Sequence, residues 1–277
     1  MRSIAILNQK GGVGKTTTAV NLSAALAATG QRVCLVDLDP QAHATLHLGR
    51  ETKPGERSVY DVLTSGTSLA EARQQIGDSY WLVPSHLDLA AAEMELAGVV
   101  GRELILRDQL EKDAENTDFD YLFIDCPPSL GVLTLNALAA VDEVFIPLQP
   151  HFLALHGLSK LLETIELVSR RLNPRLRLSG VVLCMFESGT RLAVEIGNDV
   201  DNFFARSRTA GNKPWSDAQP FQTRIRRNIR LAESPSFGQS IFQYAPDSHG
   251  ADDYRRLAAE VLAAGELRSA TEIFESP

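Results

Sequence analysis

Short apolar runs alternate along this chain with longer amphipathic segments. The runs occupy residues 4–7, 33–36, 81–83, 121–124, 144–146 and 180–184, and each is apolar at successive positions. Strands covered on both faces have this composition. The segments between the runs predict helices near residues 15–29, 87–97, 101–114, 130–139, 153–171, 190–205 and 250–264. We therefore predict an α/β fold with a doubly wound, mostly parallel sheet and helices on both faces.

This alternation continues for most of the chain without a linker. With 277 residues and 44% apolar content, the sequence is long enough to bury one large core. We predict a single domain over residues 1–265 and a weakly patterned tail over 266–277. Two stretches rich in glycine, proline and polar residues, 49–58 and 206–220, are predicted to be surface loops.

A glycine-rich run follows the first predicted strand. Residues 8–18 read NQKGGVGKTTT, and an alanine-rich helix pattern follows directly. A strand, a glycine-rich loop and a helix, in that order, form the context that a phosphate-binding loop requires. The strict consensus GxxxxGK[ST] needs glycine where this chain has Gln9, so the match is to a variant that carries a second lysine, Lys10. The pattern predicts a P-loop NTPase that binds ATP or ADP.

The residue types of this loop suit phosphate chemistry. Glycines let backbone N–H groups surround phosphate oxygens, and the start of the following helix adds positive potential. Lys15 is predicted to lie along the β- and γ-phosphates, and the Thr16 hydroxyl to be a ligand of Mg²⁺. The predicted nucleotide-binding residues of the loop are Lys10, Gly11, Gly12, Val13, Gly14, Lys15, Thr16 and Thr17. A glycine-rich turn with solvated lysines is the alternative, and the flanking strand and helix disfavour it.

Two later strand patterns end in carboxylates. The second strand leads into Asp37 and Asp39, and the run 121–124 leads into Asp125. Carboxyl ends of parallel strands meet at one edge of a sheet, so one ligand could reach all three acids. One acid of the first pair is expected to help hold Mg²⁺ and the other to orient the attacking water, while Asp125 joins the Mg²⁺ shell. Turn capping is the alternative for such acids. We also expect the second strand to lie beside the first.

Composition and charge exclude several other classes of protein. The net charge of -8 argues against nucleic-acid binding by the whole surface. Cys34, Cys126 and Cys184 lack metal-ligand spacing and lie in or beside apolar runs, which predicts buried reduced thiols. No apolar run approaches the roughly 20 residues that span a bilayer, and no leader pattern begins the chain. We predict a cytoplasmic protein.

The sequence resembles the deviant Walker A ATPases of the ParA/MinD class. The run KGGVGKTT carries the resemblance, with Lys10 five residues before Lys15. The segments VDLDPQ, DCPPSL and IRRNIRLAESPS extend it over residues 1–264, and DCPPSL favours the ParA/Soj partition branch. The chain departs from the family at Arg226, where members usually carry proline.

The resemblance implies a Mg²⁺-dependent ATPase with a slow intrinsic rate. ATP would join two subunits in a sandwich homodimer, with the early lysine of each reaching the ATP of the other. The implied catalytic residues are Lys10, Lys15 and Asp39; the metal shell is Thr16, Asp37 and Asp125; and Asn228 lies in the segment near the adenine. The ATP-bound dimer would bind non-specific nucleoid DNA until a ParB-like centromere-binding protein stimulates hydrolysis, which segregates chromosome or plasmid DNA.

Five arginines form the candidate DNA-binding surface. They are Arg191, Arg224, Arg226, Arg227 and Arg230, and the last four fall within seven residues. Binding through several such contacts should weaken steeply with salt, because each phosphate contact releases counterions. A solvated charged surface is the alternative interpretation.

The same scaffold serves several other functions, and the sequence bears on each of them. A MinD-like membrane-associated ATPase needs a C-terminal amphipathic helix, whereas residues 254–262 are small and alanine-rich. An iron protein needs paired cysteines, which are missing, and an ATP-dependent ligase is a related possibility on this scaffold. A GTPase would need an aspartate after Asn212 and Lys213, where Trp215 stands. Positioning of another cargo stays open, because the sequence does not distinguish DNA from protein clusters.

Overall fold

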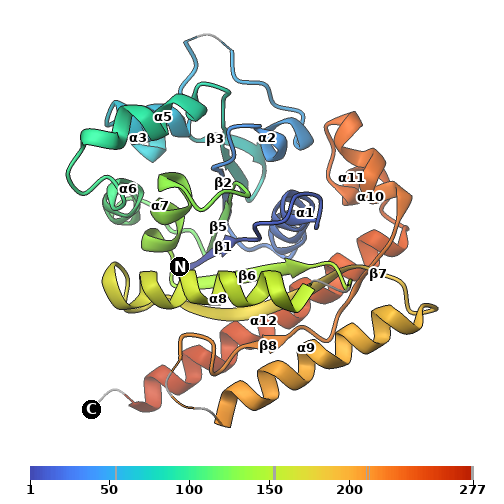
Figure 1. Ribbon diagram of the computed structural model, residues 1–277. Coiled ribbons are helices and arrows are strands. Elements are labelled where there is room, and N and C mark those ends of the chain that lie inside the picture. The colour runs from blue at the N-terminus through green and yellow to red at the C-terminus, as the bar shows by residue number, and fades with distance from the viewer. Residues whose placement is uncertain (54, 152–153, 210, 212, 276–277) are drawn as a thin grey trace.

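The computed structural model describes residues 1–53, 55–151, 154–209, 211 and 213–275. The described residues form a nine-stranded sheet in the order β3-β4-β2-β5-β1-β6-β7-β8, with β9 also paired to β7 (Figure 1). The strands are β1 (Arg2–Ile6), β2 (Val33–Asp37), β3 (Gln74–Gly77), β4 (Tyr80–Val83), β5 (Tyr121–Asp125), β6 (Glu143–Leu148), β7 (Arg177–Phe186), β8 (Gln219–Pro220) and β9 (Ile225–Arg226). Only the β3–β4 pair is antiparallel among these strands.

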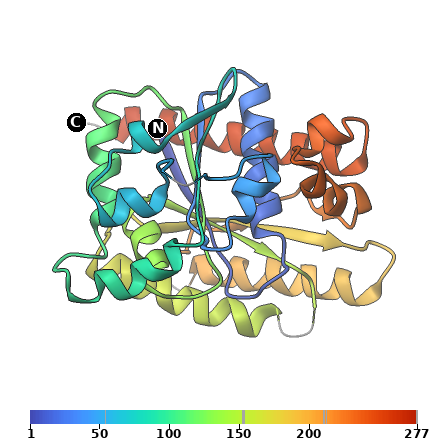
Figure 2. The same cartoon turned by 90° about the horizontal axis from the view of Figure 1, so that it is seen from above.

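Helices cover both faces of the sheet. They are α1 (Lys15–Ala28), α2 (His43–His47), α3 (Val59–Thr64), α4 (Leu69–Ala72), α5 (Leu89–Glu95), α6 (Ile105–Ala114), α7 (Val132–Ala140), α8 (Ala154–Arg171), α9 (Arg191–Thr209), α10 (Ile229–Glu233), α11 (Ile241–Tyr244) and α12 (His249–Glu275), with 3₁₀ turns η1 (Leu96–Gly98) and η2 (Ser234–Phe237). Figure 2 shows α12 on one side of β7, and α8 and α9 on the other.

The two faces hold separate apolar cores. Ala5 of β1 and the following Leu7 pack into the core under α3 to α9, whereas Ile4 and Ile6 pack into the core that includes α1 and α12. Successive side chains of a strand point to opposite faces, so burial of all four residues requires both layers. The predicted doubly wound α/β fold is confirmed.

One predicted neighbour relation is wrong. The second strand, β2, does not lie beside β1, because β5 lies between them and pairs with both. Residue Asp125 at the end of β5 is in register with Ile6 on one side and Asp37 on the other. Strand order depends on where each crossover lands, and chain order alone does not fix it. This strand order places Asp125 between the strand that precedes the P-loop and the acids at and just after the end of β2.

The C-terminal third differs in detail from the sequence expectation. Helix α12 continues to Glu275, past the predicted end at residue 264, and its residues Tyr254, Leu257 and Val261 are buried in the core that includes α1. The predicted loop 206–220 is shorter, because α9 runs to Thr209 and β8 begins at Gln219; positions 210 and 212 lie outside the described residues. Within the described part of the chain, no helix is long and apolar enough to cross a bilayer.

Candidate functional site

The glycine-rich run connects β1 to α1 and leaves the start of that helix open. Gly12 and Gly14 have φ of 72° and 97°, values that residues with a Cβ rarely adopt. Gly14 is the N-cap of α1, and no side chain caps the first turn. The N–H groups of this turn therefore have no partner inside the helix and can bind an anion.

The two lysines of the loop lie in different environments. Lys15 is buried, and its Nζ donates a hydrogen bond to the carbonyl oxygen of Lys10 at 3.3 Å. Lys10 is exposed, and its backbone N–H donates to Oδ1 of Asn8 at 3.0 Å. The Asn8 side chain in turn donates to the carbonyl oxygen of Pro147 at 2.7 Å, which fixes the loop to the end of β6. Lys15 is thus part of the cavity wall, whereas Lys10 projects from the surface.

Two adjoining cavities share Gly14 and Thr17. The first has a volume of about 600 Å³, and Gly11, Gly12, Lys15 and Thr16 line it together with Asp39, Pro128 and Pro235. The second, of about 510 Å³, lies toward β7, β9 and α10. Val13 is buried beneath the loop. The first cavity is lined by phosphate-binding groups and the second largely by apolar ones, which suits the two ends of a nucleotide.

Asp37 is buried and already fully bonded. Its Oδ2 accepts hydrogen bonds from the N–H and the hydroxyl of Thr45 at 2.8 and 2.7 Å, and its Oδ1 accepts one from the N–H of Asp39 at 3.2 Å. Burial raises the pKa of Asp37 to about 6, against the lowering effect of these bonds. Because Thr45 belongs to α2, Asp37 anchors that helix to the end of β2.

Asp125 is buried beside Asp37 without such support. Neither carboxylate oxygen has a hydrogen-bond partner among the described residues, although the hydroxyl of Thr16 lies near enough to lower its pKa. Burial first, and the charge of Asp37 second, raise the pKa of Asp125 well above its usual range. A buried carboxylate without partners is costly, and a bound cation would offset that cost.

Asp39 lines the phosphate cavity from the loop after β2. Its Oδ1 accepts a hydrogen bond from the N–H of Gln41 at 2.9 Å, and its carbonyl oxygen accepts one from the hydroxyl of Ser85 at 2.7 Å. The backbone is therefore held on both sides of the carboxylate. The second oxygen, Oδ2, has no hydrogen-bond partner among the residues that the structure describes.

These residues fit a nucleotide with Mg²⁺. The open turn of α1 and Lys15 supply donors for phosphate oxygens, and Asp125 supplies an unpartnered carboxylate near Thr16. No cluster of three His, Cys, Asp or Glu side chains in the described residues is arranged to hold a metal alone. Mg²⁺ sites in phosphate-binding proteins have this character, with one or two protein oxygens, phosphate and water as ligands.

The second cavity contains features that the sequence did not indicate. Met185 has a φ of 52° at the irregular β7–β9 pairing and lines this cavity with Cys184 and Tyr254. Asn228, predicted to lie near the adenine, also lines it, and its Oδ1 caps α10 by accepting the N–H of Arg230 at 2.8 Å. A positive φ at methionine depends on the pairing of two strands, which no local pattern reveals.

The five arginines proposed for DNA each face a carboxylate. Arg191, Arg227 and Arg230 pair with acids at the surface, and their side chains are 91%, 72% and 54% exposed. Arg224 pairs with Asp201 at 3.5 Å and lies over the ring of Phe186. Their charges are thus locally balanced, and exposed pairs of this kind exchange partners at little cost.

Arg226 is the exception, because its partner is buried. Its Nη2 donates to Oδ1 of Asp253 at 2.6 Å, and its backbone N–H donates to Oδ2 of the same residue at 2.9 Å. Asp253 is 4% exposed. The pair fastens β9 to α12 beside the second cavity, so the arginine that departs from the family pattern has a structural contact.

Replacing Arg226 with alanine should lower the free energy of unfolding by about 2 kcal/mol, because Asp253 would stay buried without its cation. Arg227→Ala is the matched control, since its partner Glu187 is exposed and such pairs contribute about 0–1 kcal/mol. Urea unfolding of both variants measures the difference. Equal stabilities would contradict a structural role for the buried pair.

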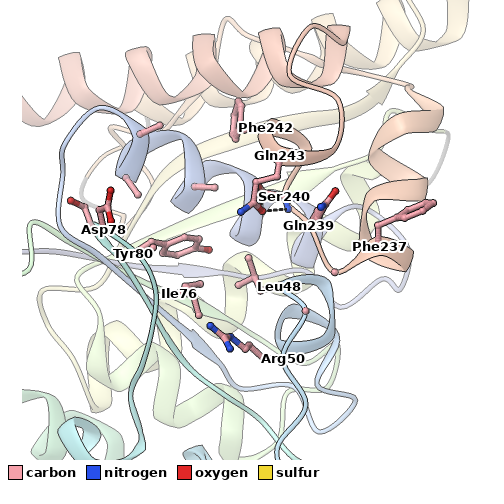
Figure 3. Close-up of a pocket in the computed structure, with 17 residues that line it drawn as sticks. Leu48, Arg50, Ile76, Asp78, Tyr80, Phe237, Gln239, Ser240, Phe242 and Gln243 are labelled. Atoms are coloured by element: carbon pink, nitrogen blue, oxygen red, sulfur yellow. Dashed lines mark hydrogen bonds between the residues drawn. The ribbon is translucent and has the colours of Figure 1, made fainter.

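Helix α2 and the 3₁₀ turn η2 lie between the phosphate cavity and a third cavity. Nε2 of His47, at the end of α2, lies 3.3 Å from the hydroxyl oxygen of Ser234. Gly49 and Gly238 also approach closely, because a Cβ on Gly49 would lie 2.8 Å from the carbonyl oxygen of Gly238. Figure 3 shows the cavity of about 650 Å³ on the other side of these two elements, with Leu48 and Arg50 below it and Phe242 and Gln243 above it. Close contact of the two segments therefore joins the loop carrying Asp39 to the C-terminal part of the site.

Comparison with known proteins identifies relatives over nearly the whole chain. A family model described as an AAA domain matches residues 1–178. The sporulation initiation inhibitor protein Soj of Bacillus subtilis (strain 168) is 45% identical over 95% of this chain and 98% of its own. The chromosome partitioning protein ParA of Caulobacter vibrioides (strain NA1000 / CB15N) is 42% identical over 98% of this chain and 97% of its own.

A solved structure of an enzyme with a different name has the same fold. Cobyrinic acid a,c-diamide synthase from Mycobacterium smegmatis, with bound ATP analog and magnesium, has a TM-score of 0.79 and 35% identity over 96% of both chains. In this chain, Cys34, Cys126 and Cys184 are all buried, and burial raises the pKa of each thiol. Given the higher identities to Soj and ParA and the geometry of its P-loop site, the chain belongs to the Soj/ParA family of partition ATPases.

Proposed function

We propose that this chain is an ATP-dependent partition protein whose ATP-bound homodimer binds DNA and releases it on hydrolysis. The observation that carries the proposal is that Lys15 and Asp39 line the cavity at the open turn of α1, with Asp125 buried close to both. The near full-length identity to Soj and ParA supports partition as the process that this hydrolysis serves.

The phosphates would be held by groups that are already in place. The glycine N–H groups and Lys15 bind the β- and γ-phosphates, while Thr16 and Asp125 would hold Mg²⁺. When bound, Mg²⁺ would neutralise negative charge on the phosphates. Asp37 would act indirectly, because its hydrogen bonds to Thr45 keep α2 and the loop after β2 in position.

Asp39 is the group proposed to orient the attacking water. Its Oδ1 is occupied by the N–H of Gln41, which leaves Oδ2 as the oxygen that can accept a hydrogen bond from water. A carboxylate held in this way aligns the water for in-line attack on the γ-phosphate. Intrinsic hydrolysis should be slow, because a single chain supplies no further cation to the transferred phosphoryl group.

Dimerisation would supply that missing cation. Lys10 is exposed and lies outside the lining of the cavity, on a surface that a second copy can reach. A cation provided in trans to a P-loop site raises hydrolysis by about 10³- to 10⁵-fold where an arginine does so. A ParB-like partner would act on this assembled site.

The DNA-binding surface is proposed to consist of Arg191, Arg227 and Arg230. Their side chains are the most exposed of the five candidates, and their pairs with Glu195, Glu187 and Glu233 are exposed as well. Phosphates can replace such partners because exposed ion pairs contribute little. Arg224 and Arg226 would instead maintain the segment that presents this surface.

Binding to non-specific duplex DNA tests the proposal. Binding should need a poorly hydrolysed ATP analogue rather than ADP, and Arg227→Ala/Arg230→Ala should lose it. A dimer would lose four contacts, so the slope of log affinity against log salt should fall by about 3–4.

The matched control is Arg57→Ala/Arg107→Ala. It removes the same charge from two arginines that likewise have acidic partners, each four residues further along the chain. This control should bind DNA as the wild type does. Equal loss in both double variants would show an effect of net charge alone, and absence of DNA binding in every nucleotide state would reject DNA as the matrix.

A further inference from the structure

Lys10 has a partner within its own chain. Its Nζ lies within hydrogen-bonding distance of Nε2 of His151. An ammonium group has only donors, so Nε2 must accept, and the imidazole is neutral with its proton on Nδ1. The two residues are 141 positions apart in the sequence, and the contact joins the P-loop to the segment that follows β6.

The backbone on both sides of this contact is held by hydrogen bonds, so the contact with His151 sets the direction of the Lys10 side chain. Asn8 holds the N–H of Lys10 and is itself fastened to the carbonyl oxygen of Pro147. The carbonyl oxygen of His151 accepts a hydrogen bond from the N–H of Ala154 at the start of α8. Hydrogen bonds therefore hold the backbone of Lys10 and of His151. The exposed side chain of Lys10 extends from the P-loop to His151.

We propose that His151 is a positioning residue that retains Lys10 in the single chain and must release it before Lys10 can enter the site of a second copy. The inference rests on the proposed function, because it assumes that dimerisation uses this lysine. One ammonium group cannot point toward both His151 and the phosphates of another subunit. Forming the dimer therefore breaks two such contacts, one in each chain.

The expected size of the effect follows from the strength of one exposed hydrogen bond. A net contribution near the lower end of the usual range corresponds to about threefold in an equilibrium constant. Two contacts broken in one dimer give about tenfold. His151 would thus keep the dimer from forming at low concentrations of ATP-bound chains.

The contact itself can be measured in the nucleotide-free single chain. Burial and the nearby Lys10 ammonium lower the pKa of His151. In an NMR titration of the histidine ring protons, Lys10→Met should raise this pKa. An unchanged His151 pKa would overturn the proposed contact, whatever the role of Lys10 in a dimer.

The consequence is measured by sedimentation with Mg²⁺ and a poorly hydrolysed ATP analogue. His151→Ala should tighten the dimer by about tenfold, whereas His151→Gln should resemble the wild type because its amide oxygen can still accept from Lys10. His156→Ala, a nearby exposed histidine on α8, is the matched control and should change nothing. Single-chain nucleotide affinity should be equal in all of these variants.

The outcomes separate the inference from the function on which it rests. A dimer of unchanged or weaker affinity in His151→Ala would overturn the inference while Lys10→Ala still prevents dimerisation. Normal dimerisation of Lys10→Ala would instead reject the proposed role of Lys10 in trans. Tightening by both His151→Ala and His151→Gln would contradict retention through an acceptor.

Discussion

Replacing Lys15 with alanine should abolish measurable binding of both ATP and ADP, with a loss of about a hundredfold or more. Lys15 is the buried cation of the phosphate cavity, and it lies near the carboxylate of Asp125. Without it, the buried acids would repel the phosphates in a region where charges are poorly screened. Calorimetric titration with each nucleotide in the presence of Mg²⁺ measures the loss.

Lys10→Ala provides the contrast for this experiment. Lys10 is exposed and does not line the cavity, so a single chain carrying this change should bind ATP with nearly the wild-type affinity. The two lysines are five residues apart in one loop and differ chiefly in burial. Retained ATP affinity in Lys15→Ala would remove the phosphate-binding assignment, and equal losses in both variants would mean that general charge governs binding.

Features encoded in one short segment were accessible from the sequence. The P-loop needs a strand, glycines at positions of positive φ and a helix start, and all of these fall within about twenty residues of each other. The apolar runs identified the central strands for a similar reason, since burial on both faces imposes apolar residues at successive positions. The fold class follows from that alternation alone.

Features that depend on distant contacts were inaccessible. The sequence predicted Asp37 in the metal shell but did not reveal that its Oδ2 accepts hydrogen bonds from Thr45, which lies in a five-residue helix too short to show periodicity. The sequence marked Arg226 as a candidate DNA contact but did not reveal its bond to Asp253 on α12, 27 residues away. The position of β5 between β1 and β2 likewise depends on a crossover. Sequence spacing gives residue types, whereas the partner of each side chain is decided by packing.

The position of Asp125 shows how this distinction bears on the site. The sequence put an acid at the end of an apolar strand, a weak signal by itself. In the sheet, Asp125 lies in register between Ile6 and Asp37, and its buried oxygens have no partner among the described residues. An unpartnered buried acid is unfavourable for folding alone. The presence of Asp125 at this buried position is explained if a bound cation supplies the missing positive charge.

Replacing Asp39 with alanine should separate binding from hydrolysis. The phosphate-binding groups would be unchanged, so ATP affinity should stay near that of the wild type. Turnover should fall by about 10²- to 10³-fold, because the water would lose the carboxylate that aligns it. Phosphate release under steady-state conditions, together with calorimetric ATP binding, measures both quantities, and an unaltered hydrolysis rate would mean that another group orients the water.

Asp37→Asn sharpens the interpretation, because Asp37 and Asp39 are close in sequence but differ in what they contact. The change should weaken the bonds to Thr45 and loosen α2, so we expect lower stability together with weaker nucleotide binding. The ATP-bound dimer should persist in Asp39→Ala, since ATP is bound but not consumed, and should be depleted in Asp37→Asn. A persistent dimer with full turnover in Asp39→Ala would be inconsistent with a cycle in which hydrolysis separates the subunits.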